Sequence, residues 1–93
     1  DEYVSINKFG LYQNYPNPFN SSTKFMYALP ENLFVNFSLY DCLGKTLMVL
    51  VNERQGPGTY TVEFNTSDLP SGIYFYRLVA GPFIETRKMI LLK

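Results

Sequence analysis

Apolar and polar residues alternate with a period of two over most of the chain. Every second residue is apolar in residues 23–29, 35–41, 59–64 and 72–80. A period of two is typical of half-buried β-strands, and no segment has the apolar spacing of an amphipathic helix. The side chains predicted to face the core are Phe25, Tyr27 and Leu29, then Val35, Phe37 and Leu39, then Tyr60, Val62 and Phe64, and finally Tyr74, Tyr76 and Leu78.

Two apolar runs lack this alternation. They read "LMVLV" at residues 47–51 and "MILL" at residues 89–92. A continuous run of this length is compatible with a strand that is covered on both faces, but its phase cannot be assigned from the sequence. We therefore expect two more strands there, and the sequence leaves open whether one face or both are covered.

Turn residues separate the strands. In "YDCLGK", Asp41 begins a tight turn and Gly44 occupies the position that favours a left-handed residue. In "AGPF", Pro82 cannot take positive φ, so a type I′ turn is excluded at Gly81-Pro82. Residues 52–58 and 65–72 carry Pro and Gly and are expected to form longer links.

The segment "NYPNPFN", residues 14–20, has two prolines, which exclude a helix and favour an edge strand or a stiff entry segment. Tyr15 and Phe19 are expected to fix this segment to the core. Counting it as the first strand gives about seven short strands with regular turn signals. The prediction is an all-β domain, a small immunoglobulin-like antiparallel sandwich.

The amino-acid composition argues against several classes of function. The 93 residues form one domain, and eight Lys and Arg balance eight Asp and Glu, so no nucleic-acid partner is expected. No stretch approaches the roughly 20 apolar residues of a transmembrane helix, so no direct membrane insertion is expected. The chain has no His, no Trp and one Cys, so neither a Ser-His-Asp nor a Cys-His set exists. We expect no catalytic residues, no metal site and no cofactor.

A few residues carry a second interpretation. The Asp and Glu carboxylates are scattered over turns and outward strand positions and are most simply interpreted as a solvated surface. Cys42 is most simply an inert thiol in a turn. Three N-x-S/T triplets, at Asn20, Asn36 and Asn65, are glycan acceptors only in a eukaryotic secreted protein. Tyr40 and Phe75 face outward and are candidates for a sugar-stacking surface. Core filling is the simpler role for most of the aromatic residues.

An ordered set of motifs covers most of the chain. The pieces are "LYQNYPNPFN", "TKFMYALPEN", "VNFSLYDCLGK", "LVNERQGPGTYTVEFNTSDLPSGIYFYRL" and "ETRKMILLK". In this order they resemble the type A C-terminal sorting domain of bacterial type IX (Por) secretion. The resemblance covers residues 11–93, and residues 1–10 are interpreted as the remnant of a linker from an upstream domain. It implies an immunoglobulin-like sandwich that directs a larger cargo protein across the outer membrane and is not itself an enzyme.

The resemblance also implies partners and a recognition site. The partners are the type IX outer-membrane translocon, a sortase-like peptidase and the upstream cargo, in a Gram-negative bacterium that secretes the protein or keeps it on its surface. The implied recognition residues are Pro16, Asn17, Pro18, Gly72, Tyr74, Lys88, Met89, Ile90, Leu91, Leu92 and Lys93. The C-terminal segment is expected to offer a free strand edge to a partner.

Two loops depart from the family's usual sequence. Residues 20–23 read "NSST" and lack a third proline, and residues 81–83 read "GPF" in place of Gly-Asp/Asn-Phe. The alternative function is that of an accessory or carbohydrate-binding module of a secreted enzyme, which shares the fold.

Overall fold

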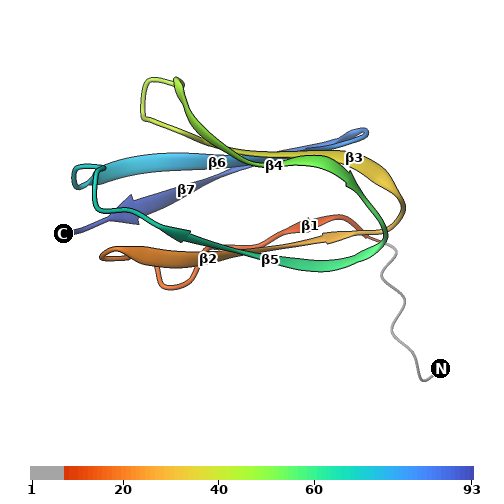
Figure 1. Ribbon diagram of the computed structural model, residues 1–93, viewed down its shortest axis with the longest axis horizontal. Coiled ribbons are helices and arrows are strands. Elements are labelled where there is room, and N and C mark those ends of the chain that lie inside the picture. The colour runs from red at the N-terminus through yellow and green to blue at the C-terminus, as the bar shows by residue number, and fades with distance from the viewer. Residues whose placement is uncertain (1–7) are drawn as a thin grey trace.

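The computed structural model describes residues 8–93, and every regular element within them is a β-strand. The strands are β1 (Gly10–Leu11), β2 (Ser22–Leu29), β3 (Leu33–Tyr40), β4 (Thr46–Gln55), β5 (Gly58–Asn65), β6 (Gly72–Ala80) and β7 (Phe83–Leu91). All strand pairs are antiparallel, in a three-stranded sheet β1-β2-β5 and a four-stranded sheet β4-β3-β6-β7. Figure 1 shows the two sheets packed face to face. The predicted small immunoglobulin-like β-sandwich is confirmed.

The core consists of the inward-facing residues of both sheets. The inward phases predicted for β2, β3 and β6 are confirmed. Phe25, Phe37 and Tyr76 are fully buried, and the residues two positions before or after them that were predicted to face the core are buried too. The Phe25 ring lies 4.7 Å from the Tyr76 ring and 5.1 Å from the Phe37 ring, centroid to centroid, so aromatic contacts join the two sheets. On β5 the phase is also as predicted, although only Phe64 is fully buried because β5 is an edge strand.

The two continuous apolar runs lie in strands β4 and β7, and neither is buried on both faces. β4 is an edge strand, and its register against β3 shifts between Phe37 and Ser38 and again between Leu39 and Tyr40. Each bulge adds one residue and resets the inward phase, so a continuous apolar run results without burial of both faces. Met48 and Val49 are about half exposed. At the other run, Met89 and Leu91 are buried whereas Ile90 and Leu92 reach solvent, which is ordinary alternation.

Most of the turn predictions are confirmed. The Asp41 carboxylate accepts hydrogen bonds from the backbone N–H groups of Leu43 and Lys45, and Gly44 has a φ of 89°. Gly81, with a φ of 58°, and Pro82 form a two-residue turn that needs positive φ only at its first position. The link predicted for residues 52–58 is wrong, because β4 continues to Gln55 and only two residues separate it from β5.

Tyr74 closes the loop before β6. Its side chain is buried, and its hydroxyl donates a 2.6 Å hydrogen bond to the Pro70 carbonyl, four residues earlier. This is the arrangement called a tyrosine corner in immunoglobulin-like sandwiches. Phe75 lies on the outer face, opposite Tyr40 of β3 and Lys88 of β7, and is half-buried.

Tyr74→Ala is expected to lower the free energy of unfolding by about 3–5 kcal/mol, because it removes a buried aromatic side chain and leaves a cavity. Phe75→Ala on the outer face should cost about 1 kcal/mol or less. Denaturant unfolding of both variants measures the difference. Equal costs for the two variants would show that the inward phase of β6 is misassigned.

Tyr27 is a second buried tyrosine with a defined role. Its hydroxyl donates a 2.6 Å hydrogen bond to the Gln55 side chain, which links β2 to the end of β4 in the other sheet. Burial raises the pKa of Tyr27 to about 12, because the phenolate is poorly solvated there. Burial also raises the pKa of Tyr76.

The raised Tyr27 pKa predicts a loss of stability in alkali. Below pH 10 the tyrosine is protonated in both states; between pH 10 and 12 the unfolded chain releases the proton first, so the free energy of unfolding falls as the pH rises. The loss from Tyr27 is on the order of 2 kcal/mol. Urea unfolding at pH 8 and pH 12 should show a smaller decrease for Tyr27→Phe than for the wild type. An identical decrease in both proteins would contradict the assignment.

Candidate functional site

The residues that carry the family motifs lie together at one end of the sandwich. We call residues 14–20, 72–74 and 88–93 the motif cluster. The last part of β7 runs along β6, where Leu91 is opposite Gly72 and Met89 is opposite Tyr74. On its other side, the backbone N–H of Phe19 donates to the Ile90 carbonyl, and the N–H of Leu92 donates to the Phe19 carbonyl, both at 2.9 Å. The C-terminal segment is therefore paired on both sides.

Asn17 completes this second edge. Its side-chain oxygen accepts a 2.9 Å hydrogen bond from the backbone N–H of Ile90. The N–H and C=O of Ile90 and the N–H of Leu92 thus all have partners in residues 17–19. The expected free edge is not present over Ile90–Leu92, because the chain's own N-terminal segment occupies it. Further along β7, the Gln13 side chain donates to the Lys88 carbonyl at 2.8 Å.

Tyr76, whose ring lies in the core, is hydrogen-bonded to the beginning of the N-terminal segment. Its hydroxyl donates a 2.8 Å hydrogen bond to the Tyr12 carbonyl and accepts a 2.9 Å hydrogen bond from the backbone N–H of Asn14. Burial raises the pKa of this hydroxyl, so it remains a donor through the neutral range. A buried side chain of the four-stranded sheet therefore sets the position of residues 12–14.

Asn14 and Thr23 fix the bend at Pro16, and the sequence analysis missed both. The Asn14 side-chain amide donates to the Pro16 carbonyl at 3.1 Å and to the Thr23 hydroxyl at 3.0 Å, and that hydroxyl donates to the same carbonyl at 2.9 Å. Both residues are 2% exposed. One signal was available for Thr23, which is a polar residue on the inward phase of β2. Nothing in the sequence pattern distinguishes Asn14 from the exposed Asn17.

The two aromatic residues of "NYPNPFN" behave differently. Phe19 is 2% exposed and packs edge-on against Phe64, so its predicted role in fixing the segment to the core is confirmed. Tyr15 is 80% exposed, so that prediction is wrong. Tyr15 still pairs through its backbone with Lys24 of β2. The segment is not the first strand either, because β1 precedes it and residues 15 and 19 make isolated bridges to different sheets.

The predicted recognition residues divide into an exposed and a buried group. The exposed residues are Pro16, Asn17, Pro18, Lys88, Leu92 and Lys93. The buried residues are Tyr74, Met89 and Leu91, and the half-buried residues are Gly72 and Ile90. Only the exposed group and Ile90 offer side chains to a partner, whereas the buried group holds the tail in place.

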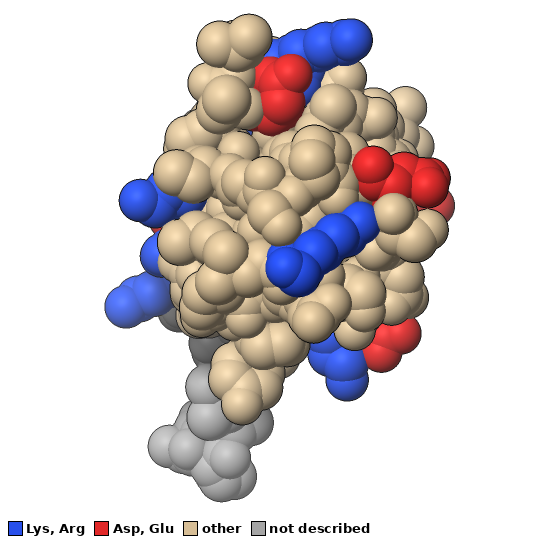
Figure 2. All heavy atoms as spheres, turned by 90° about the vertical axis from the view of Figure 1, so that its left-hand side faces the viewer, with Lys and Arg blue, Asp and Glu red and all other residues tan. Residues whose placement is uncertain are grey.

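Charges are sparse where the C-terminus lies. The chain ends beside the tip of β7 (Figure 1), and Figure 2 looks onto this end of the molecule. Its surface is mostly uncharged, with Lys, Arg, Asp and Glu side chains scattered over it and not gathered into one patch. The backbone N–H of Lys93 donates to the Ser71 hydroxyl at 2.9 Å, so the last residue is also held against the rest of the domain.

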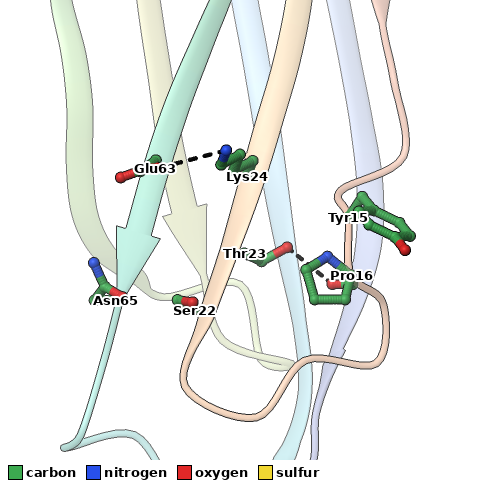
Figure 3. Close-up of a pocket in the computed structure, with 7 residues that line it drawn as sticks. All are labelled: Tyr15, Pro16, Ser22, Thr23, Lys24, Glu63 and Asn65. Carbon is green, nitrogen blue, oxygen red and sulfur yellow. Dashed lines mark hydrogen bonds and ion pairs between the residues drawn. The ribbon is translucent and has the colours of Figure 1, made fainter.

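A hollow of about 250 Å³ lies beside the Pro16 bend, and Figure 3 shows the residues that line it. The Lys24 and Glu63 side chains form an ion pair at 3.6 Å across β2 and β5. Tyr15 points away from β5 on the far side of the bend (Figure 3). The hollow is open and its one cation and one carboxylate neutralise each other, so it offers little to a charged ligand.

The residues with a second interpretation remain apart from the motif cluster. In residues 8–93, no three His, Cys, Asp or Glu side chains are placed to hold a metal ion together. Cys42 is exposed in the turn after β3. Tyr40 and Phe75 line a hollow of about 290 Å³ on the outer face, where the Arg77 guanidinium lies 4.9 Å from the Tyr40 ring centroid. One face of that ring is therefore covered by a cation.

The fold and the site define a small β-sandwich module whose motifs from both ends of the chain converge at one place. The model of the secretion system C-terminal sorting domain family matches residues 13–92. The chain belongs to this family, and the domain is a C-terminal sorting signal for type IX secretion. It therefore marks a protein for export to the cell surface or the extracellular space, and the family is in general non-catalytic.

A comparison with curated proteins gives no match to the chain. The described residues contain no helix that is long and apolar enough to cross a membrane.

Asn17→Ala is expected to speed amide hydrogen exchange at Ile90, because it removes the acceptor of that N–H group. The accompanying loss of stability should be about 1 kcal/mol, the usual size for one hydrogen bond. Exchange followed residue by residue by NMR measures both effects. Asn17→Asp keeps an acceptor oxygen and serves as the matched control. Unchanged exchange at Ile90 in Asn17→Ala would show that this hydrogen bond does not protect the tail.

Proposed function

We propose that the motif cluster is the element that the type IX outer-membrane translocon recognises on a cargo protein carried upstream of this domain. The single observation that supports this most is the convergence of the motifs. Residues 14–20, 72–74 and 88–93 are far apart in sequence, yet they share backbone pairs and hydrogen bonds at one end. In this proposal the signal is a folded surface and not a linear tail.

The physical basis of the proposal is the rigidity of that surface. The prolines restrict residues 15–18, and Asn14, Asn17 and Phe19 hold the segment to both sheets. A surface that is already ordered loses little conformational entropy when it binds, so a partner can recognise it at a low entropic cost. A rigid module at the end of a cargo also has the same shape whatever protein precedes it.

The proposal extends to the cell. The domain carries its cargo from the periplasm of a Gram-negative bacterium across the outer membrane, and a sortase-like peptidase then removes it or the product stays attached to the cell surface. The domain itself performs no catalysis. The alternative, a sugar-binding accessory module, would use Tyr40 and Phe75. It has less support, because both rings are half-buried and Arg77 covers one of them.

The export function is tested with a foreign passenger protein fused before residues 11–93 and behind a periplasmic signal peptide, in a host that has the type IX system. The passenger is expected in the medium or on the cell surface. Replacing both exposed lysines of the tail, Lys88→Gln with Lys93→Gln, should retain the passenger in the periplasm. Both side chains point into solvent, so the fold should survive the change.

Glu31→Gln, an exposed change in the β2–β3 loop, is the matched control and should be exported normally. Passenger activity in medium, on cells and in periplasmic extract is the measurement. Normal export of the lysine variant would remove the two lysines from the recognition surface. Periplasmic retention of the intact fusion in several competent hosts would overturn the sorting function itself.

A further inference from the structure

The two sides of the sandwich differ in how their strand edges are covered. On one side, residues 11–19 lie along β7 and close it through Leu11, Gln13, Asn17 and Phe19. On the opposite side, β4 and β5 are both terminal strands of their sheets, and only the two residues 56–57 connect them. We call this second side the open side.

Within residues 8–93, β5 presents backbone groups without a hydrogen-bond partner on the open side. The N–H of Thr66 donates to the Ser21 carbonyl, which makes Ser21 and Thr66 a hydrogen-bonded pair. Since such pairs alternate along an antiparallel ladder, Thr59, Thr61, Glu63 and Asn65 direct their N–H and C=O groups away from β2. The backbone of Lys24, opposite Glu63, is bonded to Tyr15 on the far side of β2, as this alternation requires.

This edge has few of the features that usually prevent strand pairing. The register of β5 against β2 is regular over all eight residues, and β5 contains neither Pro nor Lys. Its one charged residue, Glu63, is ion-paired with Lys24 of β2 at 3.6 Å. β4, in contrast, carries two bulges and the exposed charges of Glu53 and Arg54. Charges, prolines and bulges are the common means of blunting an edge. Of the two terminal strands on this side, β5 is the one suited to accept another strand.

A cleft of about 310 Å³ lies next to the end of β5. Its apolar lining comes from Leu39, Leu47, Met48, Phe64 and Leu69, and its polar lining from residues 65–68, at the end of β5 and in the β5–β6 loop. Leu47, Leu69, Tyr60 and Val62 are among the partly buried residues that pack against the core. An apolar side chain from an added strand would cover them. Among the described residues that line the cleft, Asp68 is the one charged residue, and it favours a basic partner.

We propose that the open side binds an extended segment of a partner protein, which pairs with β5 at Thr61 and Glu63 and inserts an apolar side chain between Leu47 and Leu69. The segment has apolar residues at alternate positions and a Lys or Arg near Asp68. The cleft adjoins the loop that Tyr74 closes at Pro70, so this surface continues the motif cluster. The inference rests on the proposed function and assigns the segment to the translocon.

The test uses the same exported fusion with two changes at Thr61. Thr61→Pro removes an outward N–H without breaking the ladder to β2, and proline is tolerated on an edge strand whose N–H faces solvent. Thr61→Ala keeps the N–H and separates the loss of the side chain from the loss of the backbone donor. Export of Thr61→Pro should fall about fivefold or more relative to Thr61→Ala. Glu31→Gln, which lies outside this surface, is the control that should be exported normally. Thermal unfolding of the purified domains checks that both Thr61 variants are folded.

A second variant keeps the test independent of the proline. Leu69→Arg replaces an apolar residue of the cleft with a charged one from a loop position and should reduce export to a similar extent. Normal export of folded Thr61→Pro and Leu69→Arg would overturn the inference while the sorting function stands. Equal loss of export in Thr61→Ala would also overturn it, since the backbone donor would then be irrelevant. A dimer of the purified domain that Thr61→Pro dissociates would assign the edge to a second copy and overturn the partner proposed here.

Discussion

The pairing of residues 17–19 with the end of β7 is the interaction on which the rest of the site depends. Asn17 and Ile90 are 73 positions apart, yet the side-chain oxygen of one accepts the N–H of the other, and Phe19 is hydrogen-bonded to Ile90 and Leu92 beside it. The Phe19 ring is buried in the core, so burial of apolar surface holds these polar contacts in place. Without this pairing, the last four residues would be held only by β6 and by the hydrogen bond from Lys93 to Ser71, and would fray like other exposed termini.

Buried tyrosines perform work that phenylalanine could not. Tyr74, Tyr76 and Tyr27 each fill core volume with the ring and reach a polar group at the margin with the hydroxyl, namely Pro70, residues 12 and 14, and Gln55. A loop, a terminal segment and an opposite sheet are in this way held to one small core. A domain of 93 residues has a limited apolar interior. A buried tyrosine is useful there because one side chain both packs in the core and fixes a peripheral segment by a hydrogen bond.

The difference in edge coverage between the two sides of the sandwich results from the path of the N-terminal segment. That segment pairs with β2 up to Tyr15, crosses to β7 at the Pro16 bend and then returns into β2, so within residues 8–93 no strand covers the β4–β5 side. On that side β4 is irregular, whereas β5 is regular and lies beside a cleft. The proposed recognition surface and the proposed strand-binding surface thus have a common structural origin in the path of residues 11–19.

The sequence alone determined most of the strands, the inward phases of β2, β3, β5 and β6, and the family. Phe25, Val35 and Tyr76 each belong to a series of large apolar residues at every second position, and such a series has one solution when a single face is buried. Asp41 and Gly44 likewise specify their turn locally, through a side-chain acceptor and a left-handed backbone. Motifs such as "PNP" and the C-terminal basic and apolar residues sufficed to place the chain in its family.

Tertiary structure alone decided the bulges of β4, the different fates of Tyr15 and Phe19, the burial of Asn14 and Thr23, and the closed edge of β7. Each of these depends on which distant segment lies alongside. A bulge is a mismatch between two strands, and an edge is closed only when another part of the chain reaches it. Local pattern carries no information about that neighbour, because pairing between segments more than seventy residues apart is set by the packing of the whole core.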